Sequence, residues 1–97
     1  MRESLIEDYL VSEVKKLKGE VRKVKWIGRN GAPDRLIFLP AYSPFVELKK
    51  PGKEPTAAQK REHKRMRICG MIVLVMSEYE HVDKFIADYK RKYGSKR

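Results

Sequence analysis

The sequence predicts an α/β fold with the element order α-β-β-β-α-β-α, built on a central mixed four-stranded sheet flanked by helices. Apolar residues recur at helical spacing near both ends of the chain, short apolar or alternating runs lie between them, and a capped helix joins the last two runs. The chain has 97 residues, which suffices for one hydrophobic core. We therefore expect a single domain over 1–97, with a basic, frayed tail from about residue 90.

The first half of the chain is predicted to form one helix followed by three strands. Residues 3–18 form the helix, because apolar side chains recur every three or four positions until a glycine ends the pattern. Residues 21–27 alternate between apolar and charged, as in a half-exposed strand, and an Asn-Gly pair then predicts a tight turn. The next two strands are 34–39 and 45–49, each followed by a proline.

The second half is predicted to contain a helix, a strand and a last helix. Thr56 and Gln59 have the spacing of a capping box and open a helix that Gly70 ends. The continuous apolar run 71–76 predicts a central strand buried on both faces, parallel to the strand before the helix. A second capping pattern at Ser77 opens the last helix, whose predicted buried side chains are Val82, Phe85, Ile86 and Tyr89.

The charge of the chain indicates a polyanionic partner. Lys and Arg number 23 against 13 Asp and Glu, a formal net charge of +10. Nucleic acid is the first expectation; an anionic membrane is weaker, because no run approaches the ~20 apolar residues of a spanning helix. The single cysteine excludes an intrachain disulfide and a multi-cysteine metal site. With no signal-peptide pattern at the N-terminus, we expect an intracellular protein that does not bind membranes.

Two carboxylates and a lysine lie at the ends of two predicted neighbouring strands. Asp34 opens one strand, and Glu47 and Lys49 stand near the end of the next, pointing to the same face because they are two residues apart. If the strands pair, Asp34 and Glu47 can share a divalent cation such as Mg²⁺. Lys49 could then orient or deprotonate the attacking water, or stabilise charge in the transition state. The alternative is a surface salt bridge between Glu47 and Lys49.

Polar residues on two helices extend this candidate site. Glu7 falls inside the apolar stripe of the first helix, where a carboxylate is costly unless it binds a metal or pairs with an arginine. We favour metal binding by Glu7, with a buried salt bridge to an arginine as the alternative. Gln59 either caps its helix or faces the site, with neither role preferred. His63, one turn further, is interpreted as a border residue of the core rather than a phosphate ligand.

Basic side chains on the second helix and near the strand ends form a candidate DNA-binding face. Such a face is often merely solvated, but the net charge favours contacts with DNA phosphates, which make binding salt-dependent. The predicted DNA-binding residues are Arg29, Lys50, Lys53, Lys60, Arg61, Lys64 and Arg65. Trp26 is the one aromatic residue expected to touch a base or a partner subunit.

These motifs resemble those of the VRR-NUC domain, a branch of the PD-(D/E)XK nuclease superfamily, over most of the chain. The matching segments are Ile6-Glu7, Gly31-Ala32-Pro33-Asp34-Arg35, Phe45-Val46-Glu47-Leu48-Lys49, Pro51-Gly52, and Pro55-Thr56 followed by Gln59. The resemblance implies a restriction-endonuclease-like core and a phosphodiesterase that depends on Mg²⁺ or Mn²⁺. The implied metal ligands are Glu7, Asp34, Glu47 and the main-chain carbonyl of Leu48. The implied catalytic residues are Asp34, Glu47, Lys49 and, in support, Gln59.

The resemblance also implies a partner and a quaternary state. The chain is similar to stand-alone, virus-type members of the family. This similarity implies a homodimer that acts on branched DNA, most specifically on a four-way (Holliday) junction. Symmetric resolution of such a junction needs two cuts, and a two-fold dimer supplies two active sites. The alternatives are a non-specific or flap-type nuclease, or a basic nucleic-acid-binding module without catalysis.

Overall fold

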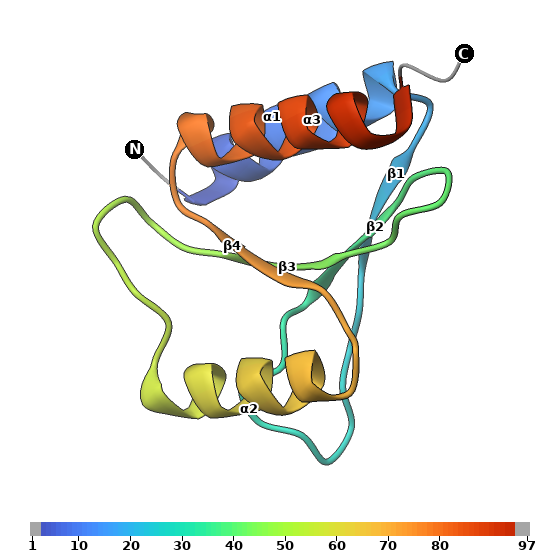
Figure 1. Cartoon of the computed structure of the whole chain (residues 1–97). Helices are drawn as coiled ribbons and strands as arrows, with labels where there is room; N and C mark the ends of the chain where they lie inside the picture. The colour runs from blue at the N-terminus through green and yellow to red at the C-terminus, as the bar shows by residue number, and fades with distance from the viewer. Residues whose placement is uncertain (1–2, 95–97) are drawn as a thin grey trace.

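The computed structural model describes residues 3–94 and has the predicted order of elements (Figure 1). The helices are α1 (Glu3–Lys16), α2 (Ala57–Ile68) and α3 (Tyr79–Tyr93), and the strands are β1 (Glu20–Lys23), β2 (Arg35–Phe38), β3 (Phe45–Leu48) and β4 (Val73–Met76). The strands form one sheet in the order β1-β2-β3-β4, antiparallel except for the parallel pair β3 and β4. The prediction of a mixed four-stranded sheet flanked by helices is confirmed.

The hydrophobic core lies between the sheet and the helix pair α1 and α3, which pack side by side on one of its faces (Figure 1). The apolar stripe of α1 supplies Ile6, Leu10 and Val14, all fully buried. The four side chains predicted for α3, from Val82 to Tyr89, are buried as expected. Among residues 3–94, no helix has both the length and the apolar character needed to cross a membrane.

Helix α2 covers the opposite face of the sheet (Figure 1). Its predicted capping box is present: the Thr56 hydroxyl accepts from the Gln59 amide at 3.2 Å, and the Gln59 side chain accepts from the Thr56 amide at 2.9 Å. The helix buries Glu62, His63 and Met66, so two of its three buried side chains are polar. This face of the sheet is therefore built differently from the core.

Strand β4 lies at the edge of the sheet, so the prediction of a central strand was wrong. Val73 and Met76 are buried, and the two residues between them are half-buried. Both α2 and α3 contact this strand. The apolar run arises because helices cover the two faces of the strand, and it does not require a second neighbouring strand.

The Asn30-Gly31 pair does not form the predicted tight turn. Strand β1 ends at Lys23, earlier than predicted, and residues 24–34 form a loop. Gly31 has a φ of +82°, and a Cβ added there would lie 2.6 Å from the carbonyl oxygen of Ala58 in α2. The glycine therefore allows the loop to pack closely against the first turn of α2.

The start of α3 differs from the predicted capping box at Ser77. The helix begins one residue later, with Glu78 as its N-cap and no capping hydrogen bond from that side chain. The Ser77 amide instead donates to Nδ1 of His81 at 3.0 Å. A histidine one turn into the helix thus accepts the hydrogen bond in place of the predicted serine and glutamate pair.

The end of α3 also differs from the prediction of a frayed tail from about residue 90. The helix continues to Tyr93, and residues 95–97 lie outside the described part of the chain. The Tyr93 ring lies against Tyr42 and Tyr89, with centroid separations of 5.7 and 5.2 Å. These aromatic contacts hold the last turn on the core despite its basic sequence.

Candidate active site

Asp34 immediately precedes β2, and Glu47 lies in the neighbouring strand β3. The antiparallel register pairs Arg35 with Val46, so the next step of the ladder sets Asp34 opposite Glu47. On its other side, the Asp34 carbonyl accepts from the Val24 amide at 2.9 Å. The two carboxylates differ in environment: the Asp34 side chain is 62% exposed and that of Glu47 is 10% exposed.

Glu47 is a buried carboxylate covered by α2. Gln59 Nε2 donates to its Oε2 at 3.3 Å, and His63 Nε2 lies 3.5 Å from its Oε1. Neither Oε1 nor His63 Nε2 has a hydrogen-bond partner among residues 3–94. Burial raises the pKa of Glu47 to about 7, opposed by the charge of Lys49 and assisted by that of Asp34. A surface salt bridge between Glu47 and Lys49 therefore does not describe this residue.

Glu7 pairs with Arg35, the alternative that the sequence left open. Arg35 Nε lies 2.5 Å from Oε2 of Glu7, and Arg35 Nη1 lies 2.9 Å from Oδ1 of Asp34. The Arg35 guanidinium lowers the pKa of the Glu7 carboxyl. Arg35 thus connects the acid of α1 to Asp34. Within residues 3–94, no three His, Cys, Asp or Glu side chains already form a group that could hold a metal ion.

Gln59 combines the two roles that the sequence presented as alternatives. Its Oε1 accepts from the Thr56 amide, while its Nε2 donates to Glu47. A primary amide has an acceptor end and a donor end, so the two bonds do not compete. The capping box fixes the side chain that reaches Glu47.

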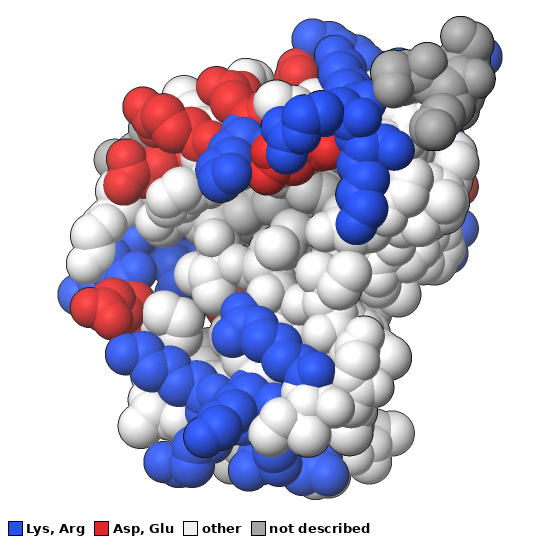
Figure 2. Space-filling model, viewed as in Figure 1, with Lys and Arg blue, Asp and Glu red and all other residues white. Residues whose placement is uncertain are grey.

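Basic side chains gather over α2 and the adjoining loops on the face that Figure 2 shows, whereas many acids lie over the two helices of the core side. Three of the basic residues have acidic partners: Lys60 lies 3.0 Å from Glu54, and Arg65 and Arg29 lie 2.7 and 3.7 Å from Glu62. Every predicted DNA-binding residue is exposed, namely Arg29, Lys50, Lys53, Lys60, Arg61, Lys64 and Arg65.

A cationic hollow of about 460 Å³ opens beside Asp34. Its basic lining residues are Lys23, Lys25, Arg29 and Arg35. Trp26 forms part of the wall: its Nε1 donates to the Pro33 carbonyl at 2.7 Å, and its ring lies 5.6 Å from that of Phe45. The indole therefore supports the loop that leads to Asp34. A larger hollow of about 620 Å³ lies between β4 and α3 and includes none of the predicted site residues.

Sequence reasoning missed the parts played by Arg35, Glu62 and His63. Arg35 shares the inward face of β2 with Ile37, and a charge at an inward strand position was the available signal. Glu62 pairs with basic neighbours although it is buried on α2. His63, interpreted from the sequence as a border residue of the core, is buried on α2 outside the hydrophobic core. Its position one turn after Gln59 points it at Glu47.

Comparison with known proteins places the chain in a family. No family model matches it. The protein named "Putative nuclease p44" from Acyrthosiphon pisum secondary endosymbiont phage 1 is 46% identical over 81 residues, covering 82% of this chain and 87% of that protein. A solved structure described as "VRR_NUC domain" aligns with a TM-score of 0.81 and 39% identity, over 90% of this chain and 96% of that one. With this fold and these identities, the chain belongs to the VRR-NUC family of nucleases.

Proposed function

We propose that the chain is a divalent-metal-dependent endonuclease that hydrolyses phosphodiester bonds in branched DNA, most specifically in a four-way junction, as a homodimer. The observation that carries this proposal is the buried carboxylate of Glu47 opposite Asp34, with Lys49 two residues away. Burying a carboxylate beside a second acid raises the free energy of the folded protein unless a cation compensates. We therefore propose that a cation from solution binds at Asp34 and Glu47 and offsets this cost.

The residues at this place fit a hard divalent cation. Oε1 of Glu47 is buried and has no hydrogen-bond partner in the described part of the chain, and Asp34 offers an exposed carboxylate across the strand pair. Carboxylate oxygens of this kind are the ligands that Mg²⁺ and Mn²⁺ prefer. Asp34 and Glu47 would hold the ion, with the main-chain carbonyl of Leu48 as a further ligand. Glu7, whose Oε2 pairs with Arg35, would add a ligand through its other carboxylate oxygen.

The remaining polar residues have distinct parts in hydrolysis. A bound ion of this type polarises a phosphoryl oxygen and acidifies the water that attacks it. Lys49, close enough for its charge to oppose the rise in the Glu47 pKa, would orient or deprotonate that water or stabilise charge developing on the phosphate. Gln59 would keep the carboxylate of Glu47 in one orientation through its bond to Oε2.

The distribution of charge supports a DNA substrate. The cationic hollow lies beside Asp34, and Arg29, one of its lining residues, lies 3.7 Å from Glu62 of α2. Exposed basic side chains gather over α2 (Figure 2). With a net charge of +10, the chain attracts a polyanion and releases its counterions on binding. We propose that a DNA backbone enters the hollow at Lys23 and Lys25 and crosses the predicted DNA-binding face of α2.

Exposed apolar side chains support the dimer. Ile27 is 94% exposed next to Trp26, and Ile68 is 75% exposed at the end of α2. Large apolar side chains left this exposed are candidates for a protein contact. A second copy of the chain would cover them and bring a second active site to the junction. Size-exclusion chromatography with light scattering tests the dimer, and Ile68→Asp is expected to shift it towards the monomer.

The decisive experiment compares a labelled four-way junction with a linear duplex of the same sequence, in Mg²⁺, Mn²⁺ or EDTA. We expect paired symmetric nicks in the junction with either metal and none in EDTA. Asp34→Ala and Lys49→Ala should abolish cleavage while leaving junction binding nearly intact. Asp8→Ala, on the exposed side of α1, is the matched control and should cut normally.

Each other outcome removes a defined part of the proposal. A Lys49→Ala or Asp34→Ala protein that cuts at the wild-type rate would show that the active site is assigned wrongly. Equal cutting of junction and duplex would remove the preference for branched DNA and leave a non-specific nuclease. Binding without cleavage in both metals, unchanged by EDTA, would favour a non-catalytic nucleic-acid-binding module.

A further inference from the structure

Two side chains of α2 meet the two oxygens of one buried carboxylate. Gln59 and His63 are four residues apart, so they project from the same face of the helix in successive turns. Gln59 Nε2 lies 3.3 Å from Oε2 of Glu47, and His63 Nε2 lies 3.5 Å from Oε1. His63 is 1% exposed, which leaves it out of reach of a DNA phosphate.

The contact between His63 and Glu47 joins two otherwise unsatisfied polar atoms. Among residues 3–94, neither His63 Nε2 nor Glu47 Oε1 has a hydrogen-bond partner, and both are buried. Leaving buried polar atoms without partners costs free energy, so native proteins rarely do it without a reason. A neutral imidazole that carries its proton on Nε2 would donate directly to Oε1.

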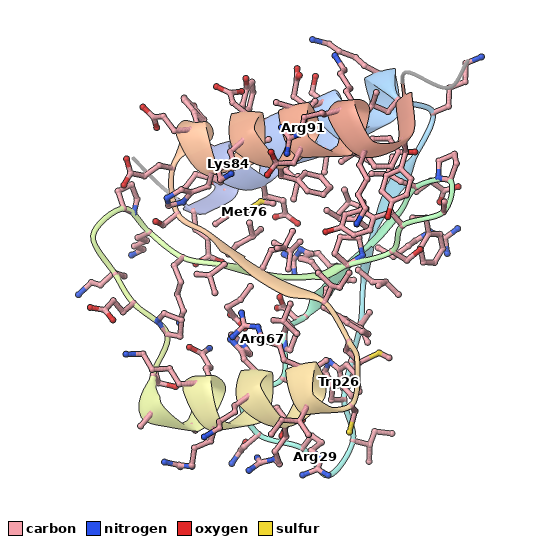
Figure 3. The ribbon with its side chains drawn as sticks, in the orientation of Figure 1. Trp26, Arg29, Arg67, Met76, Lys84 and Arg91 are labelled. Atoms are coloured by element: carbon pink, nitrogen blue, oxygen red, sulfur yellow. The ribbon has the colours of Figure 1, made fainter. Side chains whose placement is uncertain are left out.

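Neighbouring side chains hold α2 at this distance without using Glu47. Arg67, one turn after His63, donates from Nη2 to the Val73 carbonyl at 2.6 Å and so connects α2 to β4; Figure 3 shows it pointing from α2 towards the sheet. At the other end of the helix, the cap at Thr56 fixes the first turn. With both ends fixed, His63 stays directed at the carboxylate.

We propose that His63 is a positioning residue of the metal site, which donates from Nε2 to Oε1 of Glu47 and, with Gln59 on Oε2, fixes the carboxylate towards the cation. Each carboxylate oxygen accepts more than one bond, so both oxygens keep a lone pair for the ion. This inference rests on the proposed metal-dependent function. Partners that orient metal ligands in this way change metal affinity by about 10- to 100-fold when they are removed.

The test measures Mn²⁺ binding by calorimetry, without DNA, in four proteins. His63→Phe keeps a flat ring and removes the donor, and His63→Asn keeps an amide that is too short to reach Oε1. Both should bind Mn²⁺ about 10- to 100-fold more weakly than wild type. His63→Gln can place its Nε2 where the imidazole nitrogen was and should bind close to wild type. Thermal melts without metal report whether each variant folds.

The outcomes separate this inference from the proposed function. Wild type that neither binds Mn²⁺ nor cuts DNA would overturn the proposed function and this inference with it. Wild type that binds and cuts, with His63→Asn and His63→Phe binding equally well, would overturn the role of His63 alone. If His63→Phe does not fold, the comparison of His63→Asn with His63→Gln tests the inference. An equal loss of Mn²⁺ affinity in these two variants would show that His63 has a structural role only.

Discussion

The two faces of the four-stranded sheet are covered by different kinds of side chain. On one side, α1 and α3 bury apolar side chains such as Ile6, Leu10 and Val82 completely. On the other side, α2 buries Glu62 and His63 and covers Glu47. Apolar burial stabilises the fold, whereas burial of a carboxylate opposes folding. The first side therefore stabilises the fold, and the second side, which carries buried charge, is where we propose the cation site.

The largest effect is expected from a change on the apolar side. Leu10→Ala removes a fully buried side chain from α1 and should lower the free energy of unfolding by about 2–5 kcal/mol, because it leaves a cavity. Urea denaturation followed by circular dichroism measures the change. Val11→Ala, one residue further on the exposed side of the helix, is the control. A loss no greater than that of the control would contradict the assignment of stability to this side.

Glu47→Gln, on the α2 side, is expected to raise the free energy of unfolding instead of lowering it. Burial raises the pKa of Glu47 from 4.5 to about 7, so the folded protein holds a proton that the unfolded chain releases between these values. The stability that this proton contributes is complete below pH 4.5 and is lost as the pH rises to about 7. Without metal, the free energy of unfolding of Glu47→Gln should therefore exceed that of wild type by roughly 3 kcal/mol at pH 8, and the difference should disappear below about pH 4.5.

The proposed cation should stabilise wild type but not Glu47→Gln. Because the proposed ion binds only the folded protein, millimolar Mn²⁺ should raise the melting temperature of wild type at pH 8 and leave that of Glu47→Gln unchanged. Differential scanning fluorimetry measures both proteins across pH in EDTA and in Mn²⁺. A Glu47→Gln protein less stable than wild type at pH 8 in EDTA would mean that the contacts from Gln59 and His63 outweigh the cost of burying the carboxylate.

The sequence predicted the apolar side more completely than the α2 side. The spacing of Leu10 and Ile86 on their helices determines which face is buried, so the core residues could be read directly from the pattern. Asp34 and Glu47 could also be brought together, because strand order and a short connection restrict the register. These features depend on local periodicity, which a single sequence displays.

The features that could not be predicted depend on contacts between distant elements. The pairing of Glu7 with Arg35 was one of two alternatives, because helical periodicity gives the face of Glu7 but not its partner. The Asn-Gly pattern at Gly31 predicts a turn, because the close approach of Gly31 to Ala58 exists only after α2 packs against the loop. Likewise, periodicity places His63 on an inward face but does not show that Glu47 lies there.

The two roles of Gln59 can be separated by a pair of variants with a smaller effect. Thr56→Ala removes the hydroxyl that caps α2 and leaves the bond from Gln59 to Glu47, so it should lower stability by about 1 kcal/mol with little change in cleavage. Gln59→Ala removes both bonds and should lower cleavage further at a similar stability. Equal cleavage by the two variants would show that only the cap matters.

The smallest effect is expected when one lysine charge is removed, and the salt dependence of DNA binding should then differ between the two sides. Lys64 is exposed on α2. Lys84, labelled in Figure 3, is exposed on α3, and its Nζ lies 3.1 Å from Oδ2 of Asp88. If DNA follows α2, Lys64→Ala should remove one phosphate contact and reduce the slope of log affinity against log salt by roughly 0.9. Lys84→Ala should leave that slope unchanged. Fluorescence anisotropy with a labelled junction, in EDTA and over a range of salt, measures both. An equal reduction in the two variants would mean that net charge alone attracts the DNA, because a defined track on α2 requires the two lysines to differ.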